Sequence, residues 1–504
     1  MEMSDQATQP ARARIATNAL YGLATWIIPI GLSFVATPVI LRSLGHADFG
    51  IYALVLGFIG YSFTFSFGRA IIKYVAEYRR SGETEKIKAI VWSSILLNLS
   101  VGAVGVIVIG LLAPWLVRSV FLIEPEAQER SILAFYIAAV TIFATTLNQL
   151  ASAALQGLHR YDLFSKIFTF SGILTIGGNL VLALYGFGLN ALLLWNLIVI
   201  SAFAIVFLIT TKKNLPELTF PPVFEREAFK KVIYFNAGII GYQILANLLL
   251  LFERGWITNR LGVENLTYYV IPLTLGIQLH AFTASLVQVI FPLASELAND
   301  KPRLLALYLK ATKAVSIIVV FAVSMVVSLA PWFLTLWVGV DIARESTTIL
   351  QLIILAFGVT SILTVVWQMT EGLGRPTLNL LLFVPCIVIC ILLMVTLTAG
   401  YGNTGVAIAR LSGFVVLAAL IPIVEKLYFD AFQTVFWLKT VISLAVATAA
   451  AVVVSRTVVS YLDMTWIALF VSVLTGGMAY FTVLFIVRFV TFAELRSLRR
   501  STNG

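Results

Sequence analysis

The sequence has few charged residues, few cysteines and no long polar segment. Only 12% of its 504 residues are charged and 60% are hydrophobic, whereas a soluble globular domain carries about 25% charged residues. The two cysteines, Cys386 and Cys390, lie one helical turn apart in an apolar run and lack the polar neighbours of a metal site or a redox pair. The composition excludes an ordinary soluble domain and indicates a membrane protein.

Uncharged stretches of about the length of a membrane span recur along the whole chain. A spanning helix needs about 20 apolar residues. The stretches are Ile15–Leu41, Phe49–Gly68, Ala89–Val117, Ser131–Leu158, Ile167–Thr211, Val232–Phe252, Asn265–Ser295, Ala314–Val340, Ser346–Thr370, Thr377–Ala409, Thr440–Ser455 and Met464–Val487. Two of the runs split at glycine turns, Gly186–Asn190 and Gly400–Asn403. The sequence therefore predicts an all-α integral membrane protein with about fourteen transmembrane helices.

The basic residues predict the orientation of these helices. Cytoplasmic loops of membrane proteins carry the excess of Lys and Arg. With the N-terminus in the cytoplasm, 26 of the 34 basic residues fall on the cytoplasmic side. Both termini are therefore predicted to be cytoplasmic. The same distribution accounts for the net charge of +10, so no nucleic-acid partner is expected.

The two halves of the chain resemble each other at a nearly constant spacing. Four matches occur in the same order at offsets of 214 to 218 residues. They pair Asn18-Ala19 with Asn236-Ala237, Ile40–Gly45 and Tyr52 with Ile257–Gly262 and Tyr269, Gln156–Arg160 with Glu371–Arg375, and Gly186–Gly188 with Gly400–Gly402. The offset covers six helices, an even number, so both copies enter the membrane in the same sense. Such copies are related by an axis along the membrane normal.

The repeat predicts the organisation of the chain. Residues 1–211 form an N-lobe of six helices, and residues 212–231 form a cytoplasmic linker that contains Pro216, Pro221 and Pro222. Residues 232–425 form a C-lobe of six helices, and residues 426–504 hold two further helices and a cytoplasmic tail. A cavity between the lobes suits alternating access. A duplicated scaffold without a transport pathway is the alternative.

Five basic residues are candidates for binding a substrate. Ionisable side chains within membrane spans are costly and usually face a bundle interior or water. Arg410 lies inside the twelfth helix, although its side chain is long enough to extend toward the headgroups. Arg69 and Lys73 follow the second helix, where they either attract an anion or act as ordinary cytoplasmic anchors.

The other two candidates lie at helix ends. Arg254 follows Glu253 at the end of the seventh helix, where a structural pair is the alternative. Arg42 ends the first helix, and its alternative role is an ion pair with Asp48. The first six helices contain no carboxylate within their spans. A cavity lined by arginine without carboxylates favours an anion, because the guanidinium makes paired hydrogen bonds to phosphate.

Two regions resemble the polysaccharide transporter family of the multidrug/oligosaccharidyl-lipid/polysaccharide exporter superfamily. They are Pro38–Gly45 (PVILRSLG) with Phe49–Tyr52 (FGIY), and Gly68–Tyr78 (GRAIIKYVAEY). This resemblance implies a flippase that moves a polyprenyl-diphosphate-linked oligosaccharide, the repeat unit of a polysaccharide, across the bacterial inner membrane. It implies no cofactor and no enzymatic activity. The implied partners are membrane lipids, a polysaccharide polymerase and chain-length machinery.

The resemblance makes Arg42, Arg69 and Arg254 plausible members of the cationic lumen, whereas Arg410 matches no family motif. The lipid II branch has arginines inside helix 1, and none lies between Ile15 and Leu41 here, which argues against a lipid II substrate. One alternative is a cation-coupled multidrug antiporter of the same superfamily, which would need carboxylates in helices 1 to 6. The other is a membrane glycosyltransferase or polymerase, which would need a long extramembrane loop.

Overall fold

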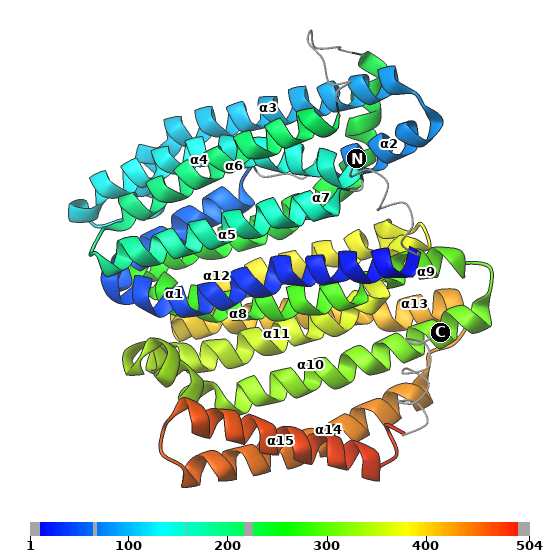
Figure 1. Ribbon diagram of the computed structural model, residues 1–504. Helices are drawn as coiled ribbons and strands as arrows, with labels where there is room; N and C mark the ends of the chain where they lie inside the picture. The colour runs from blue at the N-terminus through cyan, green and yellow to red at the C-terminus, as the bar shows by residue number, and fades with distance from the viewer. Residues whose placement is uncertain (1–10, 64–67, 159, 216–224, 492–504) are drawn as a thin grey trace. The chain divides into compact units, whose positions relative to one another are not determined.

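The structure, a computed structural model, describes residues 11–63, 68–158, 160–215 and 225–491. Within these ranges all regular structure is helical (Figure 1). The prolines of the predicted linker, His159 and the two polar tails lie outside the described residues. The chain divides into two compact units, Met1–Thr267 and Tyr268–Gly504. The predicted division into lobes of six helices stays a prediction.

The first unit contains seven α-helices and the start of an eighth within the described residues. They are α1 (Ala11–Tyr61), α2 (Gly68–Ser81), α3 (Thr84–Trp115), α4 (Pro125–Gly157), α5 (Tyr161–Leu184), α6 (Leu189–Asn214), α7 (Arg226–Leu261) and α8 (Val263–Val287). A short π-helical turn, Leu116–Val120, ends α3. The helix α7 packs against α1, α2 and α3.

The second unit contains the rest of α8 and seven further α-helices within the described residues. These are α9 (Ile290–Glu296), α10 (Lys301–Val338), α11 (Val340–Gly372), α12 (Pro376–Val416), α13 (Leu420–Phe429), α14 (Thr434–Tyr461) and α15 (Trp466–Ile486). A 3-10 turn, Leu417–Ala419, joins α12 to α13.

The helices confirm the predicted count of membrane spans. Eleven helical segments of the described chain are long and apolar enough to cross a bilayer. Two of them contain a glycine with non-helical backbone angles, Gly45 in α1 and Gly402 in α12, and are therefore two helices each. The 36-residue helix α7, which carries the uncharged stretch Val232–Phe252, is the remaining one. The described part of the chain is thus all-α, with about fourteen helices able to cross a membrane.

The backbone repeats at the positions where the sequence does. Gly45 has φ 73° and ψ 174°, and Gly262, its counterpart, has φ 90° and ψ 161°. Positive φ with extended ψ is essentially restricted to glycine, so each glycine reverses the chain between two helices without a loop. The amides of Arg160 and Arg375 donate to the carbonyls of residues five positions earlier, both over 2.9 Å.

A second pair of glycines sets a close helix contact in each unit. A side chain at Gly157 of α4 would meet the carbonyl oxygen of Ile71 in α2 at 3.2 Å. A side chain at Gly372 of α11 would clash with the carbonyl oxygen of Phe291 in α9. The short helices α2 and α9 are therefore equivalent elements of the two copies, each packed on the end of a long helix.

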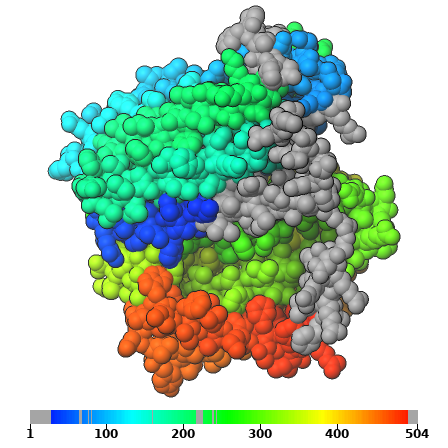
Figure 2. Space-filling model, in the orientation of Figure 1, coloured from blue at the N-terminus to red at the C-terminus, as the bar shows by residue number. Residues whose placement is uncertain are grey.

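The helices α14 and α15 pack against each other and against α10. Small residues allow this packing, since Gly476 of α15 approaches the carbonyl of Ala451 in α14 and the sulfur of Met325 in α10. The hydroxyl of Tyr480 donates to the carbonyl of Ile317 over 3.1 Å. Figure 2 shows the outer surface of this pair, orange to red, where large apolar side chains are exposed, as expected for helices in contact with lipid.

Candidate functional site: basic residues within and beside the spans

Arg254 is buried in the first unit. Its side chain is only 5% exposed. The guanidinium lies over the ring of Tyr61 in α1, with 5.0 Å between its central carbon and the ring centroid. Its Nη1 donates to the carbonyl of Leu250, one turn earlier in α7, over 3.0 Å. The preceding residue, Glu253, is fully buried as well, so both charges lie inside the unit, where electrostatic interactions are stronger than in water.

A glycine of α1 leaves room for this guanidinium. A Cβ atom at Gly57 would lie 2.5 Å from Cδ of Arg254, closer than any ordinary contact. The adjacent Phe58 packs edge-on against Phe121 and Phe135, at centroid distances of 5.8 and 5.2 Å. The absence of a side chain at Gly57 of α1 thus leaves the space that the side chain of Arg254 on α7 occupies.

Arg410 is a buried arginine of the second unit. Its side chain is 2% exposed, and its guanidinium lies 5.1 Å from the ring of Phe414 and 5.3 Å from that of Phe357. It is eight residues past Gly402, so about 12 Å into the helix at 1.5 Å per residue. The side chain therefore stays inside the unit and does not extend toward the headgroups.

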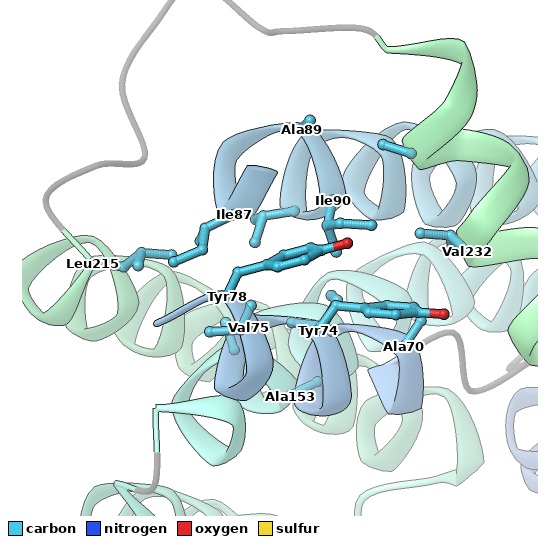
Figure 3. Packing of buried hydrophobic residues seen from close by; sticks show 14 of the residues in the cluster. Ala70, Tyr74, Val75, Tyr78, Ile87, Ala89, Ile90, Ala153, Leu215 and Val232 are labelled. Atoms are coloured by element: carbon cyan, nitrogen blue, oxygen red, sulfur yellow. The ribbon is translucent and has the colours of Figure 1, made fainter. Parts of the chain in front are cut away.

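Arg69 and Lys73 lie on the exposed face of α2. The buried face of this helix carries Ala70, Ile71, Tyr74, Val75 and Tyr78, the spacing of an amphipathic helix. Figure 3 shows these residues against α3, α4 and the first turns of α7. Arg69 makes no ion pair with a described residue.

Lys73 reaches α7 with its ammonium group. The Lys73 nitrogen lies 4.6 Å from the ring centroid of Phe235 in α7 and 5.0 Å from that of Tyr74. Two of the four candidates in the first unit therefore make contacts that involve α7. Lys73 of α2 contacts Phe235 of α7, and Arg254 of α7 contacts Tyr61 of α1. Arg254 is 19 residues beyond Phe235, so about 28 Å farther along the same helix.

Lys231 of α7 was not among the sequence candidates, although it belongs to the same group. Its ammonium donates to the hydroxyl of Tyr78 over 2.7 Å, and this hydrogen bond raises the pKa of Lys231. Burial raises the pKa of Tyr74, and the charge of Lys231 partly opposes the change. The rings of Tyr74 and Tyr78 are stacked, with centroids 5.9 Å apart, and both hydroxyls point toward α7 (Figure 3).

Arg42 is exposed, and the predicted ion pair with Asp48 is wrong. Nη2 of Arg130, from α4, lies 2.8 Å from Oδ1 of Asp48. Gly45 lies between Arg42 and Asp48 and reverses the direction of the chain there. Asp48 therefore pairs with Arg130 of α4 and not with Arg42. Arg42 makes no ion pair with a described residue, which leaves its charge available at this end of α1.

The chemistry of these groups is that of anion binding. Arginine and lysine donate hydrogen bonds and cannot accept them. In the described part of the chain, no three His, Cys, Asp or Glu side chains are grouped as metal ligands.

Residues 39–341 match the sequence profile of a family described as polysaccharide biosynthesis protein. The chain belongs to this family. It is 23% identical over 403 residues to a protein of Shigella flexneri described as "putative O-antigen transporter", and the alignment covers 78% of this chain and 94% of the relative.

Solved structures show the same fold. The lipid II flippase MurJ in an inward closed conformation superposes with a TM-score of 0.73 at 12% identity, over 93% of this chain and 99% of that one. An inward-facing multidrug transporter of the MATE family gives 0.62 at 19% identity, over 82% and 95%. This polysaccharide biosynthesis protein therefore has the fold of these transporters.

Two buried groups of hydrogen-bonded polar side chains in this family member were not predicted from the sequence. In the first unit, Nδ2 of Asn179 donates to the hydroxyl of Tyr52 over 3.2 Å and to Oδ1 of Asn196 over 2.8 Å. In the second unit, the buried carboxylate of Glu425 accepts from the hydroxyl of Tyr308 over 2.7 Å. Asn179 and Asn196 are neutral, and Glu425 lies near the end of a predicted span, so none of them stands out in the sequence as a charge within a span. Their partners also come from distant positions in the sequence.

Proposed function

We propose that this protein is a flippase for a polyprenyl-diphosphate-linked oligosaccharide, the repeat unit of a surface polysaccharide. Alternating access of two six-helix lobes around a cationic cavity carries the headgroup from the cytoplasmic to the periplasmic leaflet of a bacterial inner membrane. The family and the O-antigen transporter relative support the polysaccharide part of the proposal. The fold shared with a lipid II flippase supports movement of a lipid-linked substrate.

The buried guanidiniums of Arg254 and Arg410 carry the proposal. On insertion scales an arginine at the centre of a span costs about 2.5–3.5 kcal/mol. Both side chains are almost fully buried beside aromatic rings, so neither serves merely as an anchor at the membrane surface. A diphosphate is the substrate group that matches them, because the planar guanidinium donates two parallel hydrogen bonds to phosphate oxygens.

The remaining basic candidates fit the two ends of the same path. The positive-inside rule assigns the α2 end, with Arg69 and Lys73, to the cytoplasm, where these exposed cations attract the anionic headgroup. Arg42 lies at the opposite end of the first span, where the headgroup leaves. A polysaccharide polymerase and chain-length machinery are the partners that would consume the translocated unit.

Complementation of polysaccharide export tests this function. A bacterial strain that lacks its own O-unit flippase is supplied with the wild-type chain, Arg254→Gln or Arg410→Gln, and surface polysaccharide is measured together with membrane abundance. We expect export from the wild type and about tenfold less or none from each variant, at unchanged abundance. Arg456→Gln, which removes an exposed arginine of α14, is the matched control and should export normally.

Two results would oppose the proposal. Normal export by both Arg254→Gln and Arg410→Gln would remove the cationic path. Increased tolerance to organic-cation drugs without any restored polysaccharide would assign the chain to multidrug export instead.

A further inference from the structure

Two lysines from different helices converge on one aromatic ring. The ammonium nitrogens of Lys73 in α2 and Lys231 in α7 lie 5.0 and 5.3 Å from the ring centroid of Tyr74. They are therefore no more than about 10 Å apart. Like charges at this distance repel each other, and both ammonium groups nevertheless lie against the ring of Tyr74.

The described carboxylates near this pair do not contact it directly. Neither lysine makes an ion pair with a described acidic residue. Glu77 is the acidic residue of α2, and its side chain is exposed. Glu83, at the start of α3, pairs with Lys86 instead. Glu77 and Glu83 interact with Lys231 only through space. The two ammonium groups are held by aromatic faces and by the neutral hydroxyl of Tyr78, so neither has an anionic hydrogen-bond partner among the described residues.

The same contacts fasten the first turns of α7 to α2. Lys231 donates to Tyr78 over 2.7 Å, while Phe235 lies edge-on to Tyr74 with centroids 5.6 Å apart. Val232, between them, is fully buried in the cluster drawn in Figure 3. Lys231 is therefore the only charged side chain among these three contacts, and an anion can compete for it.

The sequence and the packing assign α7 to different parts of the chain. By the repeat, α7 is the counterpart of the first part of α1, because Gly262 follows it as Gly45 follows that segment. It therefore begins the second copy. By its contacts it belongs to the first unit, where it packs on α1, α2 and α3. The contacts of α7 with α2 therefore join segments from the two copies of the repeat.

We propose that a phosphate or diphosphate group binds between Lys73 and Lys231, draws Lys231 from Tyr78, and so frees the first turns of α7 from α2. The inference rests on the proposed function for the source of the anion, which is then the substrate headgroup. An ammonium and a phosphate attract each other as opposite charges as well as by hydrogen bonding, whereas the Tyr78 hydroxyl is a neutral acceptor. The phosphate group therefore binds Lys231 more strongly than the hydroxyl of Tyr78 does.

Amide hydrogen exchange of the first turns of α7, residues 226–236, measures the release directly. The full chain in lipid nanodiscs is exposed to farnesyl diphosphate, and exchange is followed by mass spectrometry. We expect about tenfold faster exchange in this segment, as for local opening of a helix end. Lys231→Gln should exchange fast without ligand and respond no further, whereas Lys230→Gln, which removes the exposed neighbouring lysine, should behave as the wild type.

Tyr78→Phe separates the hydrogen bond from the aromatic contact. It removes only the hydroxyl that accepts from Lys231, so basal exchange should rise while farnesyl diphosphate still binds. Inorganic pyrophosphate distinguishes the source of the anion. A much weaker effect than that of farnesyl diphosphate assigns the site to a lipid headgroup, and an equal effect assigns it to free phosphate, with the release of α7 supported in both cases.

The inference fails if farnesyl diphosphate leaves exchange at 226–236 unchanged or slows it in the wild type. That failure is distinct from failure of the flippase function, because the wild-type chain would still restore surface polysaccharide in cells. Conversely, ligand-induced opening in a chain that restores no polysaccharide would retain the site and remove the proposed substrate.

Discussion

Asn196 and Arg410 occupy the same position in the two copies of the repeat. Asn196 is seven residues past Leu189, where α6 begins after Gly188, and Arg410 is seven residues past Asn403, where the second part of α12 begins after Gly402. Both side chains are buried. The copies therefore place a neutral amide in one unit and a guanidinium in the other at equivalent sites.

The partners of these two residues have diverged as well. Asn196 accepts from Asn179, which lies 18 residues past the start of α5. The residue 18 positions past the start of α12 is Met394, which is fully buried. The first unit thus has a hydrogen-bonded group where the second has an apolar residue and an arginine over two phenylalanine rings. The charge needed for an anion is present at this position in one copy only.

Arg410→Lys and Arg410→Gln separate charge from shape at the second-unit site. Lysine keeps the positive charge without the planar fork, so we expect polysaccharide export to fall but remain measurable, whereas glutamine should abolish it. Phe357→Leu removes one of the two rings that the guanidinium contacts and should weaken the cation–π contact by about 0.5–2 kcal/mol. Export and membrane abundance are measured side by side. Equal export from the lysine and glutamine variants would contradict a role for the charge.

The amide group of the first unit is predicted to be structural. Asn196→Ala removes one of the two acceptors of Asn179, and such a loss costs about 1–3 kcal/mol. The apparent unfolding temperature in detergent should therefore fall. The double variant Asn179→Met with Asn196→Leu removes both amides and gives an apolar site like that of Met394. It should recover part of the loss, while the hydroxyl of Tyr52 loses its donor. A double variant less stable than Asn196→Ala would show that the amides do more than satisfy each other.

Gly45 and Gly262 should be intolerant of any side chain. Each has positive φ and extended ψ, and alanine there costs about 1–3 kcal/mol in backbone strain. Gly45→Ala and Gly262→Ala should lower thermal stability, although no atom within 4 Å would touch the added methyl group. Gly110→Ala, in the open helical position of α3, is the control and should be neutral or stabilising.

Glu425 should anchor α13 and the start of α14. Its carboxylate accepts from the hydroxyl of Tyr308, the indole of Trp437 and the amide of Gln433, over 2.6 to 2.7 Å. Glu425→Gln replaces an oxygen acceptor by a donor and should cost about 1–3 kcal/mol. Faster proteolysis at the α13–α14 turn is the measurement. Glu345→Gln, on an exposed residue of α11, should leave the cleavage rate unchanged.

Local sequence rules predicted the spans and the reversals well. The apolar lengths predict fourteen helices, and the glycines at 186 and 402 stand at the turns that the repeat assigned to them. The buried state of Cys386 and Cys390 also agrees with their apolar neighbours. Each of these features depends on residues close together in the chain, where periodicity and backbone angles are informative.

Side-chain partners were harder to predict, because they come from distant segments. Arg130, 82 residues beyond Asp48, forms the ion pair that Arg42 was expected to make. Lys231 contacts Tyr78 across 153 residues, and in the sequence it is indistinguishable from any other basic residue beside a span. The amphipathic pattern of α2, which buries both tyrosines, was the available signal for that contact.

The single residue Gly262 is the whole connection between α7 and α8. Most of α8 belongs to the second unit, whereas α7 packs in the first. Adjacent Cα atoms are about 3.8 Å apart, so the facing ends of the two helices cannot separate by more than about 8 Å. Any movement of α8 relative to α7 is therefore a change of angle about this glycine and not a translation, and the displacement it produces grows with distance along each helix.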